Sequence, residues 1–309
     1  MRGAARAGGR LALAVLGGVA LSGVYCGDPS SLLQDDDPRD AWRVLETQGG
    51  WSALALGEEQ ACGSDRETGR FACYPYDATA DAANLYPPHS STPPQVAVGV
   101  LVCSLGSNRR VSCWGEVDGV GWRGLSGLPD LVQLDVAGRY ACGVDDQQEV
   151  HCWGDDEGSD ALDEANTNAT AVVTGRGHGC LLTTFGEVRC WGDPAGNSAL
   201  RDFGQALAPP GQFTALSAGH EHTCGLTDAG TIVCWGDPAV VDETPSGLFT
   251  ELASGRGFSC AAQANRVVSC WGDLGGIEGQ TLQADSVKAG GRHVCVLREG
   301  NGVSCQVGG

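Results

Sequence analysis

Cysteine is the residue type whose spacing says most about chemistry in this 309-residue chain. Fourteen of the fifteen cysteines form seven pairs, six separated by ten positions and the first by eleven. Thiolates could bind zinc, but zinc sites usually place cysteines two to four residues apart. A strand, a tight turn and a returning strand fit within each pair, so we predict seven disulfides, each inside one repeat. The predicted bridges join Cys62 with Cys73, Cys103 with Cys113, Cys142 with Cys152, Cys180 with Cys190, Cys224 with Cys234, Cys260 with Cys270 and Cys295 with Cys305.

Histidines are the next candidates for catalysis or metal binding. His178, His222 and His293 each stand two residues before the first cysteine of a pair. The equivalent positions hold Gln60, Leu101, Tyr140 and Phe258, which favours a packing role. His220 and His222 would share a face of an extended segment and could begin a metal site, but we identify no third ligand. We therefore predict no bound metal.

Carboxylates recur but do not form a recognisable active site. An aspartate follows Trp-Gly in several repeats and is expected to cap a turn, at Asp155, Asp193, Asp237 and Asp273. Asp155, Glu157 and Asp160 could hold calcium but lack the ordered spacing of a calcium loop, so a solvated acidic loop is the default. Nucleophile-elbow, metalloprotease and phosphate-loop motifs are absent from the sequence. No catalytic residue and no cofactor are predicted, although a glycosidase-like acid pair stays open.

A repeated pattern of short elements surrounds the cysteine pairs. The first cysteines of successive pairs lie 35 to 44 residues apart, a period typical of propellers and solenoids. Each repeat has a short apolar stretch, a glycine four or five residues before the first cysteine, and a β-former two residues before the second. With 48 glycines, the chain favours an all-β fold rich in turns. Five pairs end in Cys-Trp-Gly, and we expect these tryptophans to fill the space between neighbouring blades: Trp114, Trp153, Trp191, Trp235 and Trp271.

The fullest repeat, AGHEHTCGLTDAGTIVCWG at Ala218–Gly236, resembles the repeats of the regulator of chromosome condensation family, and most closely its cysteine-containing bacterial members. The resemblance runs from Trp51 to the end of the chain. It implies a seven-bladed β-propeller over residues 51–309, with one disulfide-bridged hairpin per blade. The family's Gly-Gln-Leu-Gly segment is missing, and the linkers vary in length. A WD-type propeller is the alternative, but glycine follows the tryptophan after the second cysteine in all five repeats that have one.

The residues before the repeats predict export. Arg2, Arg6 and Arg10 precede an apolar run, Leu11–Leu21, which is shorter than the roughly 20 residues that span a bilayer. This pattern predicts a signal peptide over residues 1–25, with an uncleaved anchor helix as the alternative. Disulfides persist only in oxidising compartments, so we expect an extracellular, periplasmic or cell-surface location.

Residues 26–50 form an acidic linker with two features of their own. Cys26 is the unpaired cysteine, and its place after the apolar run is that of a lipidated bacterial N-terminus. Tyr25 just before it suits a lipobox poorly, so a lipid anchor and a soluble form both stay open. The chain ends four residues after Cys305, so a strand that closes the ring is expected before Trp51, at Trp42–Glu46.

Charge and linker composition set the functional expectation. The formal net charge of −19 argues against binding nucleic acid or an anionic membrane. The two longest early linkers hold residue types that are enriched at binding hot spots, although these could equally fold over the blade edges: Tyr74, Tyr76, Tyr86, Trp122 and Arg123. We expect an exported, monomeric, non-enzymatic binding or scaffold propeller that recognises a protein partner through its inter-blade loops. A secreted propeller enzyme or lectin acting on glycans or small molecules is the alternative.

Overall fold

The computed structural model describes residues 42–45, 51–58, 60–65, 71–75, 95–114, 116–117, 120–121, 127–154, 168–192, 203–274, 282–298 and 303–307. All of them belong to the unit that spans Asp35–Gly309. The predicted signal peptide and most of the predicted linker sites lie outside the described residues, namely Cys26, Tyr76, Tyr86, Trp122, Arg123, Asp155, Glu157, Asp160 and Asp193. No helix of the described residues is long and apolar enough to cross a membrane.

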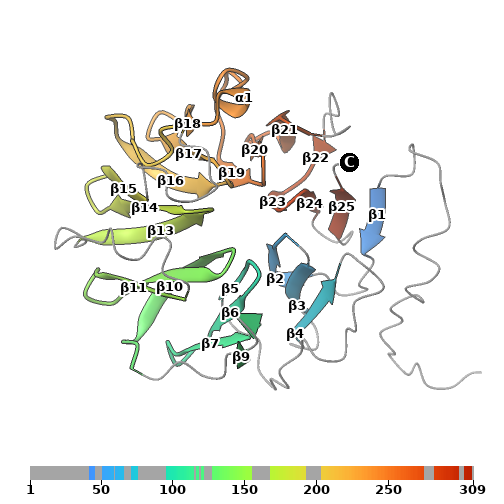
Figure 1. The fold of residues 1–309 in the computed structure, drawn as a ribbon. Coiled ribbons are helices and arrows are strands. Elements are labelled where there is room, and N and C mark those ends of the chain that lie inside the picture. Colours follow the sequence, from blue (N-terminus) through green and yellow to red (C-terminus); the bar gives the residue numbers. More distant parts are fainter. Residues whose placement is uncertain are drawn as a thin grey trace, which may run out of the picture. The chain divides into compact units, whose positions relative to one another are not determined.

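The repeats fold as seven antiparallel sheets, and Figure 1 shows them arranged as the blades of a ring. Within each blade the three strands follow chain order, from an inner strand through a middle strand to an outer one. The first four blades are β2 (Trp51–Leu56), β3 (Gln60–Asp65) and β4 (Phe71–Pro75); β5 (Gln95–Val98), β6 (Val102–Leu105) and β7 (Val111–Trp114); β10 (Leu131–Ala137), β11 (Tyr140–Asp145) and β12 (Val150–Gly154); β13 (Ala169–Gly175), β14 (His178–Thr183) and β15 (Val188–Gly192). The last three are β16 (Phe213–Ala218), β17 (His222–Thr227) and β18 (Ile232–Gly236); β19 (Glu251–Ser254), β20 (Phe258–Ala262), β21 (Val267–Gly272) and a fourth strand β22 (Leu282–Gln283); β23 (Ser286–Gly290), β24 (His293–Leu297) and β25 (Val303–Val307).

Short elements complete the description. A two-stranded ribbon, β8 (Glu116–Val117) with β9 (Val120–Gly121), follows the second blade, and one four-residue helix, α1 (Pro238–Val241), follows the fifth. Asp237 is the N-cap of α1, since its Oδ1 accepts a hydrogen bond from Ala239 N at 3.0 Å. The turn-capping role predicted for this aspartate is confirmed.

The ring closes through two sets of contacts. Each inner strand contacts the next, and β2 of the first blade also contacts β23 of the last. In addition, β1 (Trp42–Leu45) pairs with β25 as the outermost strand of the seventh blade, with Arg43 opposite Cys305. A segment from before the first repeat therefore completes the last sheet.

The expected all-β propeller with one bridged hairpin per blade is confirmed. Each disulfide joins the middle and outer strands of one blade, and the bridged Cα atoms lie 4.0–4.1 Å apart, the separation of a non-hydrogen-bonded antiparallel pair. Each bridge closes a loop of about eleven residues, worth roughly 2.7 kcal/mol in the chain-entropy model. All seven predicted pairings are present: Cys62 with Cys73, Cys103 with Cys113, Cys142 with Cys152, Cys180 with Cys190, Cys224 with Cys234, Cys260 with Cys270, and Cys295 with Cys305.

In two of the hairpin turns an asparagine precedes a residue with positive φ. Asn108 precedes Arg109 (61°), and Asn265 precedes Arg266 (71°). The asparagine side chains accept backbone hydrogen bonds two residues on, from the amides of Arg110 and Val267. The turn is thus stabilised by an Asx interaction, and the left-handed position carries no glycine in these blades.

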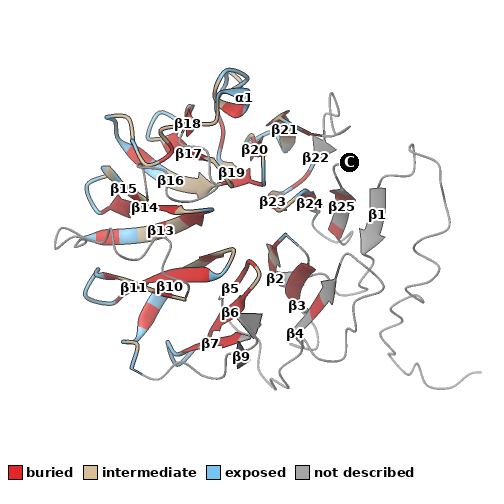
Figure 2. Cartoon of the chain, in the orientation of Figure 1, coloured by how far each residue is buried: buried red, intermediate tan, exposed pale blue. Residues whose placement is uncertain are grey.

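Buried tryptophans fill the space between blades, as the sequence predicts. Trp153, Trp191, Trp235 and Trp271 are each at most 9% exposed (Figure 2 shows the burial along the strands). Each joins an apolar cluster with residues of the preceding blade: Trp191, for example, with Cys142 of the third blade. The backbone of Trp114 lies in β7, and its side chain is outside the described part.

Candidate functional site

The bends between inner and middle strands form one face of the ring, which we call the bend face. In the described residues it comprises 57–58, 99–101, 138–139, 176–177, 219–221, 255–257 and 291–292. Backbone hydrogen bonds join the bends of neighbouring blades, such as Arg176 N to His220 O (3.0 Å) and Arg256 N to Gly291 O (2.6 Å). Gly219 lies so close to the next bend that a Cβ atom there would overlap the Gly255 carbonyl oxygen. Glycine therefore sets the blade spacing at this face.

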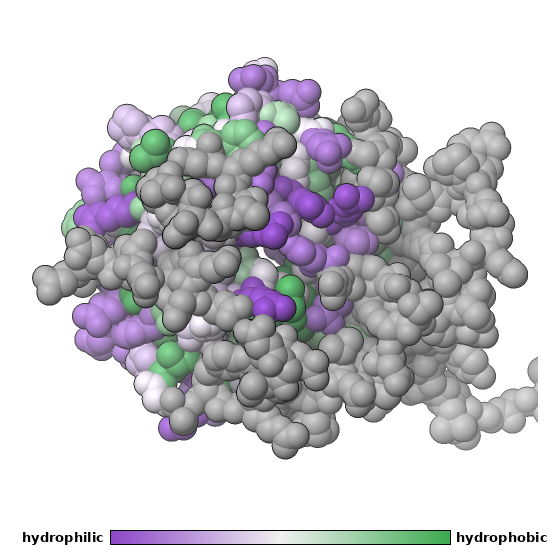
Figure 3. Space-filling model, in the orientation of Figure 1, coloured by the Kyte–Doolittle hydropathy of each residue, from purple (hydrophilic) through white to green (hydrophobic). Residues whose placement is uncertain are grey.

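A central channel of about 670 Å³ opens within the ring and is lined by the inner strands of all seven blades. The space-filling view shows hydrophilic side chains beside the central hollow (Figure 3). Two charged residues of the inner strands line it, Asp135 on β10 and Lys288 on β23. A channel of this size is within the range of small-molecule sites, in which charged side chains can bind a ligand or take part in catalysis.

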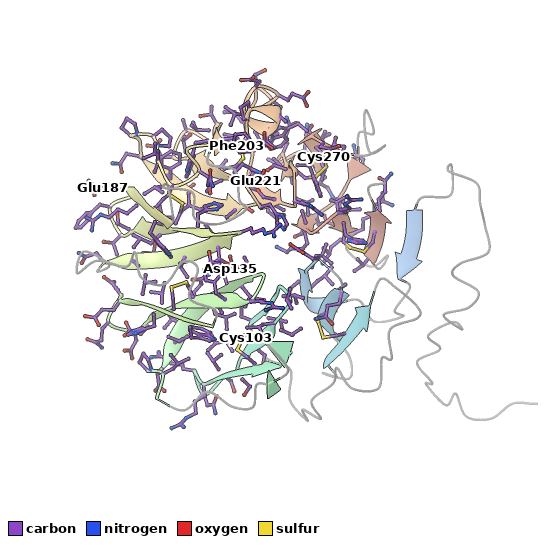
Figure 4. The ribbon with its side chains drawn as sticks, in the orientation of Figure 1. Cys103, Asp135, Glu187, Phe203, Glu221 and Cys270 are labelled. Atoms are coloured by element: carbon purple, nitrogen blue, oxygen red, sulfur yellow. A yellow bond between two sulfur atoms is a disulfide. The ribbon has the colours of Figure 1, made fainter. Side chains whose placement is uncertain are left out.

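Asp135, labelled in Figure 4, joins two blades. Its Oδ2 accepts hydrogen bonds from Thr174 N (2.7 Å) and Thr174 Oγ1 (3.0 Å) on the inner strand of the next blade. Burial raises the pKa of Asp135 to about 6, against the lowering effect of the Thr174 hydrogen bonds. The two Thr174 donors belong to the neighbouring blade, so this carboxyl group holds the two blades together.

Other polar side chains of the inner strands act in the same way. The Gln95 side chain donates a hydrogen bond to Leu134 O and accepts one from Leu134 N on the next inner strand. Gln133 makes the same two hydrogen bonds with the backbone of Val172. At the equivalent position of the sixth blade, Glu251 accepts from Val287 N (3.0 Å), Ser286 Oγ (2.8 Å) and Lys288 Nζ (3.0 Å). The charged and amide groups of the channel wall thus connect neighbouring blades.

The three repeat histidines are buried, and two of them contact the following blade. His178 Nε2 lies 2.9 Å from Thr223 Oγ1, and His222 Nε2 lies 2.8 Å from Ser259 Oγ, in each case on the following blade. Burial lowers the pKa of His178 and His293 to about 4 and that of His222 to about 3. The packing role predicted for these positions is confirmed, and His222 is not paired with His220 for metal binding.

A smaller pocket of about 340 Å³ lies on the bend face beside the channel, and Arg176 and His220 line both cavities. Arg256 and Arg292 line it from the next two blades. Among the described residues, no carboxylate lies within 4 Å of the guanidinium groups of Arg176, Arg256 or Arg292. The pocket thus gathers arginines that form no ion pair in this part of the chain.

Acidic side chains reach the same region from two directions. Glu58, in the bend of the first blade, is hydrogen-bonded through Oε1 to His220 Nε2 in the bend of the fifth. Hydrogen bonding by His220 lowers the pKa of Glu58, and the charges of His220, Arg176 and Arg256 add to this effect against burial. Glu221 (labelled in Figure 4), Asp237 and Asp273 also line the pocket.

The arginines of the bend face were not singled out in the sequence, although a signal for them exists. In four repeats a Gly-Arg dipeptide stands in the bend, at Gly138-Arg139, Gly175-Arg176, Gly255-Arg256 and Gly291-Arg292. The chain as a whole is acidic, with 38 acidic and 19 basic residues. A basic residue recurring at one structural position of an acidic repeat protein predicts a local charge on one face.

A second group of polar residues, Asp145, Glu149 and His151, has side-chain atoms close enough to hold a metal ion. Asp145 Oδ1, however, accepts from the amides of Gln147 and Glu149 at 2.9 Å, and Asp145 Oδ2 lies 2.8 Å from His151 Nε2. These hydrogen bonds lower the pKa of Asp145 although burial opposes them. The group is accounted for as the cap of the β11–β12 turn.

Of the predicted partner-binding residues, only Tyr74 lies in the described part. Its backbone belongs to β4, opposite Ala61, one pair away from the Gln60–Pro75 pair at the bend of the first blade. The long linker that holds Tyr76 and Tyr86 therefore leaves the ring at the bend face. Because outer strands run parallel to inner ones in these blades, the other inter-blade linkers also begin on this face.

Comparison with known proteins agrees with this fold. Residues 213–239 match the family model of the regulator of chromosome condensation (RCC1) repeat. No curated protein sequence matches the chain significantly. The ectodomain of the Physcomitrella patens receptor kinase CR4 superposes with a TM-score of 0.66 at 24% identity, over 83% of this chain and 73% of that one.

Two further structures are similar. The CRINKLY WD40 ectodomain of the Arabidopsis thaliana receptor kinase ACR4 gives a TM-score of 0.62 at 19% identity, over 82% of this chain and 94% of that one. Prp20p of Saccharomyces cerevisiae, described with its binding properties to Gsp1p and histones, gives 0.59 at 16% identity, over 82% and 81% of the two chains. At these identities the similarity shows an RCC1-like propeller fold and nothing finer.

Proposed function

We propose that this chain is an exported, non-enzymatic propeller that binds a protein partner through its bend face and the inter-blade linkers that begin there. The observation that carries the proposal is the distribution of charge. The charges of the channel wall join blades to one another, whereas Arg176, Arg256 and Arg292 on the bend face form no ion pair among the described residues. A face whose arginines form no ion pair with the described residues suits an interface, since a partner can supply the opposite charges.

The compartment and the relatives support the same proposal. Seven disulfides in one chain require an oxidising environment, which fits the predicted signal peptide. Two of the similar structures are receptor ectodomains, and Prp20p has described binding properties toward proteins. The linkers with Tyr76, Tyr86, Trp122 and Arg123 would extend the interface beyond the pocket.

A pair of exposed alanines on opposite faces allows a controlled test. Ala239 lines the bend-face pocket, and Ala229 lies in the β17–β18 turn at the other end of the same blade. A photo-crosslinking amino acid is placed at either position, and the exported fraction is irradiated and analysed by mass spectrometry. We expect one defined protein adduct from position 239 and none from position 229.

The outcomes separate the two functional classes. Adducts from position 229 alone would show that the interface lies on the face opposite the bend face, which would contradict the proposal. If neither position gave a protein adduct and the wild-type protein retained oligosaccharides on a glycan array, the secreted lectin or enzyme would be the better description.

A further inference from the structure

The carboxylate of Glu58 lies at the mouth of the channel. Glu58 comes from the first blade, yet its side chain is hydrogen-bonded to His220 of the fifth, 162 positions later. The side chain of Glu58 is 37% exposed, so solvent and a partner can reach it, whereas that of His220 is 15% exposed. His220 is thus the less accessible residue of the pair, and Glu58 is the residue that a partner can reach and displace.

The surroundings of Glu58 favour an anionic oxygen at this place. His220, Arg176 and Arg256 all stabilise its ionised form, which is why the pKa of Glu58 is lowered although burial would raise it. The backbones of Arg176 and Arg256 are held by hydrogen bonds to the neighbouring bends. Because their side chains start from fixed points and have no carboxylate partner among the described residues, they can take up an additional carboxylate with little rearrangement.

The acidic residues that line the pocket restrict which anions fit. Glu221, Asp237 and Asp273 line it together with Arg292. Chains of closely spaced negative charge, such as sulfated glycans or polyphosphates, would meet these three carboxylates and be repelled. A single carboxylate flanked by basic groups would satisfy both the arginines and the acidic residues of the pocket.

We infer that the channel mouth is a recognition site for one carboxylate of a protein segment with flanking basic residues, and that Glu58 occupies this site until the partner's Asp or Glu displaces it. The inference rests on the proposed protein-binding function. Displacement exchanges one carboxylate for another on His220, so no covalent bond changes. Glu58 then acts as an internal competitor that weakens every ligand by the free energy of its own contact.

The test uses the full mature protein and a defined probe, the capped pentapeptide Gly-Lys-Glu-Lys-Gly, with Gly-Lys-Gln-Lys-Gly, which has an amide in place of the carboxylate, as its control. Binding is measured by titration calorimetry at low ionic strength. We expect the glutamate peptide to bind and the glutamine peptide to bind at least about tenfold more weakly, since a hydrogen bond to a charged group is worth about 1.5–3 kcal/mol.

Three variants locate the contact. Arg256→Gln should weaken the glutamate peptide about tenfold or more. Glu58→Gln should strengthen it by a similar factor, because the internal competitor is removed. Arg109→Gln is the matched control, because Arg109 is paired with Asp146 at 2.8 Å in a hairpin turn at the opposite end of the second blade, and it should leave binding unchanged.

Several results would overturn the inference. Equal binding of the two peptides, weaker binding to Glu58→Gln, or tighter binding of a heparin fragment than of the glutamate peptide would each do so. The proposed function fails separately, because crosslinking at position 239 reports a protein partner whatever chemistry the partner presents. A crosslinked partner together with no preference for the glutamate peptide would reject this site and leave the function standing.

Discussion

His222 Nε2 lies 2.8 Å from Ser259 Oγ, so an imidazole of the fifth blade is hydrogen-bonded inside the sixth. This side chain is fully buried, and burial lowers its pKa to about 3, with smaller contributions from His178 and His220. His178 and His293 have pKa values of about 4 for the same first reason. All three histidines are therefore neutral in the folded protein well below pH 6.5, the ordinary pKa of histidine in an unfolded chain.

This relationship predicts acid sensitivity. Between pH 6.5 and 4 the unfolded chain binds protons at these three histidines and the folded protein does not, so the free energy of unfolding falls as the pH falls. Asp135 acts in the opposite sense between about pH 4 and 6, because its raised pKa keeps a proton on the folded protein. The effect of the three histidines exceeds that of Asp135. Urea unfolding should therefore give a lower free energy of unfolding at pH 4.5 than at pH 7.

His222→Phe isolates one contribution. Phe258 occupies the same position in the sixth blade, so an aromatic ring without a titrating group is compatible with the fold. Near pH 5 the variant should lose about 1.4 kcal/mol per pH unit from the slope of unfolding free energy against pH. An unchanged slope would mean that His222 takes up its proton in the folded protein.

Trp235 tests whether the repeat tryptophans stabilise the fold or bind the partner. The side chain is 7% exposed, donates Nε1–H to Gln205 O at 3.0 Å, and packs with Cys180 of the preceding blade. Trp235→Ala should lower the free energy of unfolding by about 3–5 kcal/mol through the cavity it leaves, and the secreted yield should fall. Phe185→Ala, at a side chain that is 68% exposed, is the control and should change stability little. A stable Trp235→Ala that no longer captured the partner would instead make the tryptophans part of the binding site.

The sequence was sufficient for features that recur at one place of the repeat. The cysteine pairs and the packed residue two before the first cysteine occur in all seven repeats, and the tryptophan occurs in five, so the copies together identify each role. The Glu58–His220 contact was not predictable in this way, because it joins the first and fifth blades across the mouth and depends on how the ring closes. Likewise, Asp135, Gln133 and Glu251 act between blades, yet each occurs in only some repeats and leaves no periodic signal.

Gly219 shows how closely neighbouring blades approach. A Cβ atom at this position would overlap both Gly255 O and His222 Cε1, so Gly219→Ala must move a bend or a buried ring. We expect a loss of about 1–3 kcal/mol in the free energy of unfolding. Gly257→Ala is the control two residues into the next bend, because its nearest neighbour would be Asp273 Cβ at 3.6 Å, an ordinary contact. Equal melting temperatures for the two variants would show that the bends are not tightly spaced.

The pairing of β1 with β25 predicts a difference between two proline substitutions in adjacent positions. The Cα atoms of Cys295 and Cys305 are 4.0 Å apart, so these residues form a non-hydrogen-bonded pair, and the peptide groups of Cys305 point away from β24 toward β1. Arg43 stands opposite Cys305 and donates its amide hydrogen to β25, whereas the next residue, Val44, directs its amide away from β25.

Proline removes the amide hydrogen, so Arg43→Pro should lose a hydrogen bond between β1 and β25, and Val44→Pro should keep it. Arg43→Pro should therefore lower the free energy of unfolding by about 1 kcal/mol or more beyond Val44→Pro, and hydrogen exchange at the amides of β25 should become faster. Equal destabilisation and unchanged exchange would show that β1 does not close the last blade in this register.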